Sequence, residues 1–357
     1  MDSWVVDFLA IFCLTFLFTC SVALMFAQRF CWFAIFMVQL STTVIVMIVF
    51  GCKIDGNAER SLELSFFLKN LKAGAHRGLS LDAPENTLAA IKFSKALEAD
   101  LVEVDVSLTA DGTAVLMHDE TVDRTTNGSG RIASMTDKEV ATLNAAAKFR
   151  NGTAFGFEKV PSLKEAALLV VELNMKMIID VKWSDQRTIN AIVELYKENP
   201  SLYRTAAVSS FHPMVAVAIE RLDPMIITGH TWCAGMFSQK SCNDRKRRYD
   251  NNMLHYVSVI FERLYIRLLH DVVARYTGAD LMLVERQSIS KRYVDDMKHN
   301  SINVIAWTVN DPLEKEYYSS VLVCPYLTDA MENAKRRNEE LSQPAKDTCS
   351  VSSCENG

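Results

Sequence analysis

The chain has 357 residues, 49% of them hydrophobic, which is the size and composition of a globular protein with one large domain or two. Its net charge of −5 gives no support for a nucleic-acid partner. Nine cysteines, four of them in the apolar first 52 residues, without a CxxC pair or zinc-ligand spacing, exclude a dense disulfide framework and a zinc site.

Two apolar segments open the chain. Residues 8–27 contain twenty residues without a charge, residues 30–52 contain twenty-three, and only Gln28 and Arg29 separate them. Each is long enough to cross the ~30 Å hydrocarbon layer of a bilayer as a helix. We expect residues 1–53 to supply one or two transmembrane segments, which makes the chain an integral membrane protein. A cleaved signal peptide is the alternative.

Two features disagree about the side of the membrane on which the remaining chain lies. The basic residues between 53 and 72 follow the second apolar segment and favour a cytosolic location. Asn127-Gly-Ser and Asn151-Gly-Thr are sequons that would be glycosylated in a lumenal or extracellular domain, which predicts a glycoprotein. The sequence alone leaves the orientation open.

From residue 71 to 332, short apolar runs alternate with amphipathic helical patterns. Candidate strands are 72–75, 101–106, 114–117, 177–182, 206–210, 225–229, 281–285, 303–308 and a brief one at 326–328. Candidate helices are 85–98, 162–173, 186–197, 213–222 and 288–299. This alternation predicts an α/β fold, a TIM (β/α)8 barrel, with a doubly wound sheet as the alternative from pattern alone.

Two insertions interrupt the predicted barrel, at about 121–160 and 232–278. The second contains Cys233 and Cys242, which are placed to form a disulfide, and a helical stretch, 253–275. Because Glu262 and Arg263 lie within that stretch, it is not expected to cross a membrane. It either packs on the barrel or lies on a bilayer as an amphipathic helix. Residues 333–357 are expected to be disordered.

A carboxylate pair lies on the strand predicted at 101–106. Residues two apart on a strand share one face, so Glu103 and Asp105 point together. Two buried carboxylates repel each other and lose hydration, so they need a compensating cation. Oxygen ligands suit Mg2+ or Ca2+. The alternative is a polar strand face bridged by lysine or arginine.

Further polar residues cluster at predicted strand ends. Asp180 would complete the metal site, and Lys182 would neutralise a phosphate oxygen, unless the two form a structural ion pair. His76 and His118 each follow a candidate strand, and Arg77 supplies a planar fork suited to phosphate.

This combination of side chains fits phosphoryl transfer to water. A metal and cations offset charge on the phosphorus, one imidazole deprotonates the nucleophile, and the other protonates the leaving alkoxide.

Ordered motifs from residue 72 to 330 resemble the glycerophosphodiester phosphodiesterase family. They include AHRGLSLDAPENT, LVEVDV, VLMHDETVDRTTNGSG, VPSLKEAAL, IIDVK and AWTVN. Details of VLMHDETVDRTT and the YYSS near the C-terminus are similar to an animal membrane-bound subgroup.

The resemblance implies a TIM barrel that binds a divalent metal, usually Mg2+, and hydrolyses glycerophosphodiesters to glycerol 3-phosphate and an alcohol. By matching motif, the metal ligands are Glu103, Asp105 and Asp180, the acid and base are His76 and His118, and Arg77 and Lys182 bind phosphate. The resemblance also implies that the barrel lies on the lumenal or extracellular side of the plasma membrane or the endoplasmic reticulum.

Two departures and two alternatives accompany the resemblance. Asp180 stands where many members have Glu, and Leu79 stands where Gly often follows HRG.

The chain would act on soluble glycerophosphodiesters such as glycerophosphoinositol, or as a lysophospholipase D on lysophospholipids or glycerophospho-N-acylethanolamines. The subgroup resemblance also allows a membrane scaffold that binds regulators of G-protein signalling.

Overall fold

The computed structural model describes residues 15–17, 19, 39, 58–242, 244–274 and 277–331. The predicted tail at 333–357 and nearly all of the segments predicted to cross a membrane lie outside these residues. Among the helices that are described, none combines the length and apolar character that a membrane span requires. The chain divides into two units, Met1–Asp55 and Gly56–Gly357, and the fold below is that of the second.

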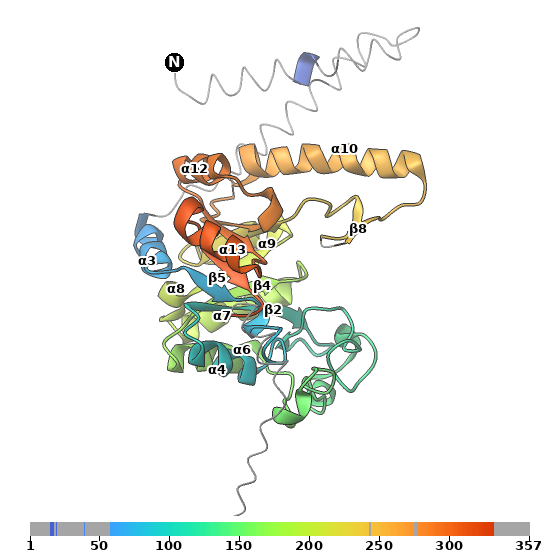
Figure 1. The fold of residues 1–357 in the computed structure, drawn as a ribbon, viewed down its shortest axis with the longest axis vertical. Helices are drawn as coiled ribbons and strands as arrows, with labels where there is room; N and C mark the ends of the chain where they lie inside the picture. Colours follow the sequence, from blue (N-terminus) through green and yellow to red (C-terminus); the bar gives the residue numbers. More distant parts are fainter. Residues whose placement is uncertain are drawn as a thin grey trace, which may run out of the picture. The chain divides into compact units, whose positions relative to one another are not determined.

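Eight parallel strands form a closed barrel surrounded by helices (Figure 1). In barrel order the strands are β1 (Ala73–Ala75), β2 (Leu101–Leu108), β4 (Lys176–Val181), β5 (Ala206–Ser210), β6 (Ile227–Trp232), β9 (Leu281–Glu285), β10 (Asn303–Trp307) and β11 (Tyr326–Thr328). Pairing of β1 with both β2 and β11 closes the sheet. The TIM barrel prediction is therefore confirmed, and the doubly wound sheet is excluded.

The alternation of side chains along each strand separates two cores. On β2, Val102 and Val104 face outward and pack with the surrounding helices. Leu101 on the same strand faces inward, where it packs with Ile178 and Leu327 from other strands. Phe67 joins this interior cluster from α3 (Ala58–Leu68), so the helix that precedes the first strand contributes to the barrel core.

Most of the described helices begin at a residue whose side chain caps the helix. The remaining α-helices are α4 (Leu88–Ala96), α5 (Asp137–Val140), α6 (Leu163–Glu172), α7 (Gln186–Glu198), α8 (Leu202–Thr205), α9 (Pro213–Leu222), α10 (Asn252–Leu268), α12 (Lys291–His299) and α13 (Pro312–Glu316). Ser162 and Glu165 form a reciprocal capping box at the start of α6, and the Thr87 side chain caps α4. The predicted helices agree with these bounds within a few residues.

One predicted strand has a different role from the one expected. The strand predicted at 114–117 exists as β3 (Ala114–Leu116), but it pairs antiparallel with β2 and is not one of the eight barrel strands. A tight connection of five residues allows only a hairpin between neighbouring strands, whereas a parallel pair needs a long crossover. The short strand at 326–328 takes the eighth position instead.

Apart from residues 243, 275 and 276, the two insertions lie in the described part of the chain. The segment after β3 contains only short helical turns around a small cluster that includes Val122, Ile132 and Val140. The segment after β6 contains a hairpin of β7 (Gln239–Ser241) and β8 (Asp244–Arg247), followed by α10. The disulfide that the sequence allowed between Cys233 and Cys242 is present.

Candidate active site

All seven residues that the sequence singled out line one cavity of about 250 Å³. Its wall contains His76, Arg77, Glu103, Asp105, His118, Asp180 and Lys182, together with apolar side chains that include Phe211, Leu283 and Trp307. His76 and Arg77 follow β1, and Glu103 and Asp105 lie within β2. Asp180 is near the end of β4, Lys182 follows that strand, and His118 comes shortly after β3. The cavity therefore opens at the carboxyl ends of the barrel strands, where TIM-barrel enzymes place their active sites.

Three buried carboxylates meet at the base of this cavity. Glu103 and Asp105 point inward from β2, and Asp105 lies directly opposite Asp180 in the register between β2 and β4. One oxygen from each of Glu103, Asp105 and Asp180 lies within 4.8 Å of the others. This set of oxygen donors fits a hard divalent cation such as Mg2+ or Ca2+.

Two cationic side chains offset part of the triad's charge. The Lys182 Nζ lies 2.6 Å from Asp105 Oδ1 and 2.6 Å from Asp180 Oδ2. The Arg77 Nε lies 3.3 Å from Asp105 Oδ2, and the Arg77 backbone N–H donates to Glu103 Oε2 at 2.9 Å. Both cations pair with Asp105, so the buried triad keeps carboxylate oxygens that could bind a further cation.

The two carboxylates of β2 titrate in opposite directions. Burial raises the pKa of Glu103 to about 7, and the neighbouring Asp105 charge adds to that shift. Burial alone would also raise the pKa of Asp105, but Lys182 and Arg77 outweigh it and hold that pKa far below its usual range. The charge of Glu103 is therefore less compensated by neighbouring cations than that of Asp105.

His76 is oriented by a carboxylate from the last barrel strand. Its Nδ1 lies 2.7 Å from Asp329 Oδ1, directly after β11. Burial lowers the pKa of His76, but the hydrogen bond to Asp329 and the charge of Glu103 outweigh it and raise that pKa above its ordinary value. Ser80 and Asn310 also donate to Asp329, at 2.6 and 2.7 Å. With Nδ1 held in this way, Nε2 is the ring atom available for proton transfer.

His118 has the same arrangement with an adjacent residue. Its Nδ1 lies 2.7 Å from Asp119 Oδ1, and Arg124 Nε donates to Asp119 Oδ2 at 2.5 Å. The sequence placed His118 at the end of a barrel strand, whereas it follows the antiparallel β3. It still lines the cavity because β3 folds back along β2, where the Met117 backbone N–H donates to the Asp105 carbonyl at 3.0 Å.

Several residues that hold the site were not predicted. Asn86 donates to Asp105 Oδ2 at 2.7 Å and accepts from the Asp105 N–H at 2.9 Å. Ser209 and Thr231 donate to Asp180 Oδ1, at 3.0 and 3.3 Å. Glu85 pairs with Arg124 at 2.7 Å and with Arg77 at 3.3 Å. The inward alternation of β5 and β6 would have indicated Ser209 and Thr231, but 225–229 was predicted to end before Thr231.

The loop after β1 adopts a strained conformation. Arg77, Gly78 and Leu79 all have positive φ, at 50°, 78° and 66°. Leu79, which departs from the Gly common at that position, is nevertheless fully buried in the outer core. Its apolar contacts offset the cost of a left-handed conformation, which is of the order of 1–2 kcal/mol for a residue with a side chain.

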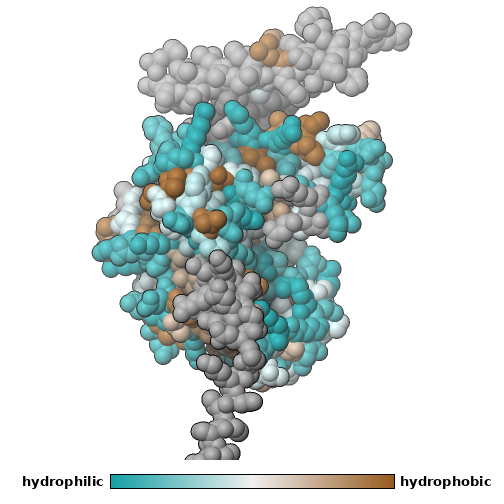
Figure 2. Space-filling model, viewed as in Figure 1, coloured by the Kyte–Doolittle hydropathy of each residue, from teal (hydrophilic) through white to brown (hydrophobic). Residues whose placement is uncertain are grey.

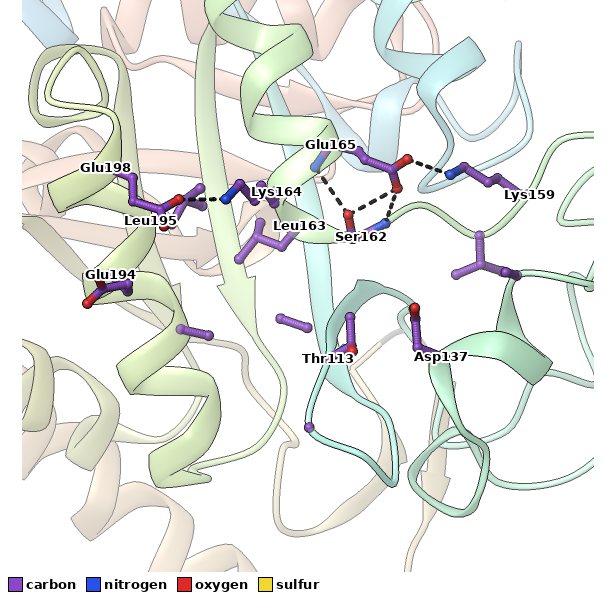
Figure 3. A pocket seen from close by; sticks show the side chains of 15 residues that line it. Thr113, Asp137, Lys159, Ser162, Leu163, Lys164, Glu165, Glu194, Leu195 and Glu198 are labelled. Atoms are coloured by element: carbon purple, nitrogen blue, oxygen red, sulfur yellow. Dashed lines mark hydrogen bonds and ion pairs between the residues drawn. The ribbon is translucent and has the colours of Figure 1, made fainter.

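A separate hollow of about 540 Å³ lies on the surface beside α6 and α7 (Figure 3). Both lysines in its wall are paired, Lys164 with Glu198 at 2.7 Å and Lys159 with Glu165. It contains none of the seven predicted residues. It therefore has no evident part in the chemistry of the barrel.

A (β/α)8 barrel with a buried carboxylate triad, two histidine–aspartate pairs and two cations at its carboxyl face is an arrangement that suits a phosphoric diester hydrolase. Residues 76–333 match the sequence profile of the Glycerophosphoryl diester phosphodiesterase family. The chain belongs to this family, which confirms the resemblance drawn from its motifs and the predicted enzyme class.

Relatives and solved structures agree with this assignment. The chain is 37% identical over 272 residues to human glycerophosphodiester phosphodiesterase 1, covering 76% of this chain and 82% of that protein. It is 38% identical over 274 residues to the mouse protein of the same name, covering 77% and 82%. A phosphodiesterase of Oleispira antarctica in complex with its product sn-glycerol-3-phosphate is similar in structure, with a TM-score of 0.59, 25% identity and coverage of 75% and 95%. A glycerophosphodiester phosphodiesterase structure from Agrobacterium tumefaciens shares the fold, with a TM-score of 0.56, 21% identity and coverage of 73% and 97%.

Proposed function

We propose that the chain hydrolyses glycerophosphodiesters to glycerol 3-phosphate and an alcohol in the cavity at the carboxyl end of its barrel. The observation that carries this proposal is the convergence of all seven predicted residues on that one cavity. The Oleispira antarctica structure with bound sn-glycerol-3-phosphate supports glycerol 3-phosphate as the product released here. Soluble glycerophosphodiesters such as glycerophosphoinositol are the first substrates to test.

Glu103, Asp105 and Asp180 would hold the divalent metal, with Mg2+ preferred and Ca2+ as the alternative. A metal at this position supplies Lewis-acid stabilisation of negative charge on the phosphoryl oxygens. The protein's own contribution is a buried set of oxygen donors whose charge is only partly offset by Lys182 and Arg77. Both cations would neutralise phosphate oxygens when substrate enters the cavity.

His76 and His118 would share the proton transfers. One imidazole accepts a proton from the nucleophile through its Nε2, and the other donates a proton to the leaving alkoxide. Each is held by a carboxylate on Nδ1, Asp329 in one case and Asp119 in the other. Asp329 and Asp119 would therefore act as positioning residues that orient each ring and select its tautomer.

The test is release of glycerol 3-phosphate from glycerophosphoinositol by the detergent-solubilised full chain, with Mg2+ and with a chelator. We expect metal-dependent release in the wild type and loss of activity in Glu103→Ala. Glu194→Ala, at an exposed position on α7, is the matched control and should behave as wild type. Chelator-resistant release, or full activity of Glu103→Ala, would exclude the proposed metal site.

We also propose that the apolar segments 8–27 and 30–52 anchor the chain in a membrane, with the barrel on the lumenal or extracellular side. Two observations support the orientation. The Cys233–Cys242 disulfide is of a kind that persists in oxidising compartments. Asn127 and Asn151 of the two sequons are exposed, where a glycosyltransferase has access.

A further inference from the structure

We propose that the exposed apolar face of α10 inserts into the surface of a phospholipid bilayer and brings the cavity next to lipid. This inference rests on the proposed function and deepens it, because it favours acylated glycerophosphodiesters, presented in a membrane, as substrates. The partner is the bilayer itself, in the plane of its headgroups.

The outer face of α10 is apolar along its whole length. Met253, Tyr256, Val257, Ile260, Leu264 and Leu268 recur at helical spacing, and each is more than half exposed, with Met253 at 70% and Ile260 and Leu264 at 60%. A helix that only packs on a barrel directs such residues inward. Figure 2 shows brown side chains along this edge of the molecule among teal ones.

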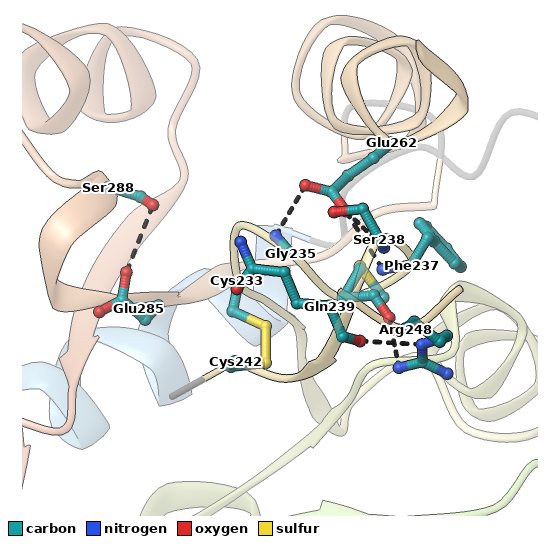
Figure 4. Close-up of a disulfide and its surroundings, with 11 residues drawn as sticks. Cys233, Gly235, Phe237, Ser238, Gln239, Cys242, Arg248, Glu262, Glu285 and Ser288 are labelled. Atoms are coloured by element: carbon teal, nitrogen blue, oxygen red, sulfur yellow. Dashed lines mark hydrogen bonds between the residues drawn. A yellow bond between two sulfur atoms is a disulfide. The ribbon is translucent and has the colours of Figure 1, made fainter. Parts of the chain in front are cut away.

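The polar face of the same helix is directed toward the protein. Glu262 and Ser258 are buried. The Glu262 carboxylate accepts from the backbone N–H of Gly235 at 2.7 Å and from the Ser238 N–H and hydroxyl at 3.1 and 2.9 Å (Figure 4). Phe237 packs its ring 5.1 Å from that of Phe261. These contacts fix the rotation of α10, so the outward direction of the apolar row is determined by the fold.

Positive charge flanks the apolar row. Arg263 is exposed on α10, and Lys246, Arg247 and Arg248 are exposed immediately before it. Arg247 donates to Asn252 Oδ1, and Arg248 donates to the carbonyls of Gln239 and Met236, all of them uncharged acceptors. An apolar face bordered by basic residues, which can pair with lipid phosphates, is the pattern of a helix that lies on a bilayer surface.

The helix lies in the surface and does not cross the membrane. α10 and the π-helical turn Leu269–Val273 that continues it contain no run of ~20 uncharged residues, which is what a span needs. Glu262, Arg263 and Arg267 also fall within it, and charged residues are costly in the hydrocarbon layer. In-plane insertion buries the apolar row while the polar face stays bound to the loop.

The length of chain before the barrel favours the bilayer over a second copy as the occupant. If residues 30–52 span the membrane, only residues 53–57 separate the span from α3. Six peptide steps reach at most about 20 Å. Because α3 is part of the barrel core through Phe67, the whole barrel is then held close to the bilayer surface. The short connection therefore keeps the bilayer within reach of the barrel surface at all times, whereas a second copy must first diffuse to it.

The loop that α10 holds also forms part of the cavity wall. The residues bonded to Glu262 lie inside the loop closed by the Cys233–Cys242 disulfide (Figure 4). Ser241 and Cys242 at the end of that loop line the cavity with the predicted site residues. Docking of α10 would thus place this side of the cavity mouth at the lipid surface, where an acyl chain can remain in the bilayer during hydrolysis.

The first test locates the helix directly. The full chain is reconstituted in vesicles of phosphatidylcholine and phosphatidylserine, with a diazirine amino acid at Ile260 or, as control, at the exposed Leu168 on α6. We expect phospholipid adducts from position 260 and none from position 168. A crosslink from position 260 to a second copy or to residues 1–57, or reaction with water alone, would overturn the proposal.

The second test separates docking from catalysis. In the double variant Ile260→Asp/Leu264→Asp we expect hydrolysis of vesicle-bound lysophospholipid to fall by about tenfold or more, with turnover of soluble glycerophosphoinositol unchanged. Equal loss on both substrates, or loss on neither, would contradict docking. If the wild type hydrolysed neither substrate, the proposed function would fail, and the lipid adducts would still decide whether α10 contacts the bilayer.

Discussion

His76 and Asp329 lie 253 positions apart in the sequence and 2.7 Å apart in the fold. The contact exists because β1 and β11 are neighbours in the closed barrel and both residues follow their strands directly. Burial favours the uncharged form of Asp329, but the hydrogen bond to His76 outweighs it and holds the pKa of Asp329 below its usual range. Asp329 is thus an anion throughout the pH range in which histidine titrates, and it stabilises a protonated His76.

Replacement of Asp329 by Asn tests this positioning role. The amide can present its N–H₂ to Nδ1, which favours the wrong tautomer, and it no longer stabilises the imidazolium. We expect kcat/KM for glycerophosphoinositol to fall by roughly 10²-fold or more, with a shifted pH–rate profile. Asp295→Asn, at an exposed position on α12, should leave both unchanged. An unshifted profile with wild-type kcat/KM would exclude Asp329 from this role.

At the scale of single elements, the loop after β1 contains consecutive residues with positive φ, an unfavourable backbone conformation close to the site. Gly78 has a φ of 78°, and a Cβ at this position would lie 2.6 Å from the Ala90 Cβ on α4. The glycine is therefore required both by its backbone conformation and by the close packing of α4 beneath the loop. This packing aims Arg77 and His76 at the cavity.

Gly78→Ala should accordingly destabilise the protein. Positive φ and the clash with Ala90 together predict a loss of roughly 2–4 kcal/mol in the free energy of unfolding. Gly112 is the matched control, because its φ is 90° and nothing lies within 4 Å of the position that a Cβ would occupy. Gly112→Ala should lose only the conformational part, about 1 kcal/mol. Denaturant unfolding of both variants measures the difference, and equal losses would show that the clash is relieved.

At the scale of the whole molecule, burial of His230 makes stability depend on pH. His230 lies on β6 and faces outward from the barrel, where its Nε2 lies 2.7 Å from the Thr277 hydroxyl. Burial lowers the pKa of His230 to about 4 from its ordinary value of 6.5. The unfolded chain therefore binds a proton that the folded chain excludes between these two pH values.

The sign of the effect follows directly. Stability from the neutral His230 is fully present above pH 6.5 and is lost as pH falls toward 4, at about 1.4 kcal/mol per pH unit. Compared with His230→Gln, the wild type should lose unfolding free energy as pH falls from 7 to 4.5. Because other titrating groups cancel in this comparison, parallel stability curves would contradict the buried neutral imidazole.

Orientation in the membrane is a property of the whole chain and is tested by its sequons. With the barrel on the lumenal side, protein made in animal cells should migrate faster on a gel after endoglycosidase treatment. Asn127→Gln/Asn151→Gln should remove that shift. If endoglycosidase treatment left the migration of the wild-type protein unchanged, this result would contradict use of the sequons. The predicted binding of a regulator of G-protein signalling stays a prediction, since no contact in the described residues addresses it.

Several features followed from the sequence alone, because they depend on local periodicity. The alternation in VEVDV placed Glu103 and Asp105 on one face, and the alternation of strands and helices predicted the barrel. These inferences hold since a strand directs residues two apart to the same side wherever it lies in the fold. The order of the motifs along the chain indicated the family and identified the seven site residues.

Only the tertiary structure decided which distant residues complete the site. The closure of β1 on β11 brings Asp329 to His76, and the register of β2 with β4 sets Asp105 beside Asp180. Residues 114–116 form a strand as predicted, but they pair with β2 as an antiparallel hairpin and are therefore not one of the barrel strands. The apolar row of α10 was visible in the sequence, but its outward direction depends on Glu262 binding the disulfide loop. Hydrophobic periodicity identifies the faces of a helix, whereas long-range hydrogen bonds determine which face meets the solvent or a membrane.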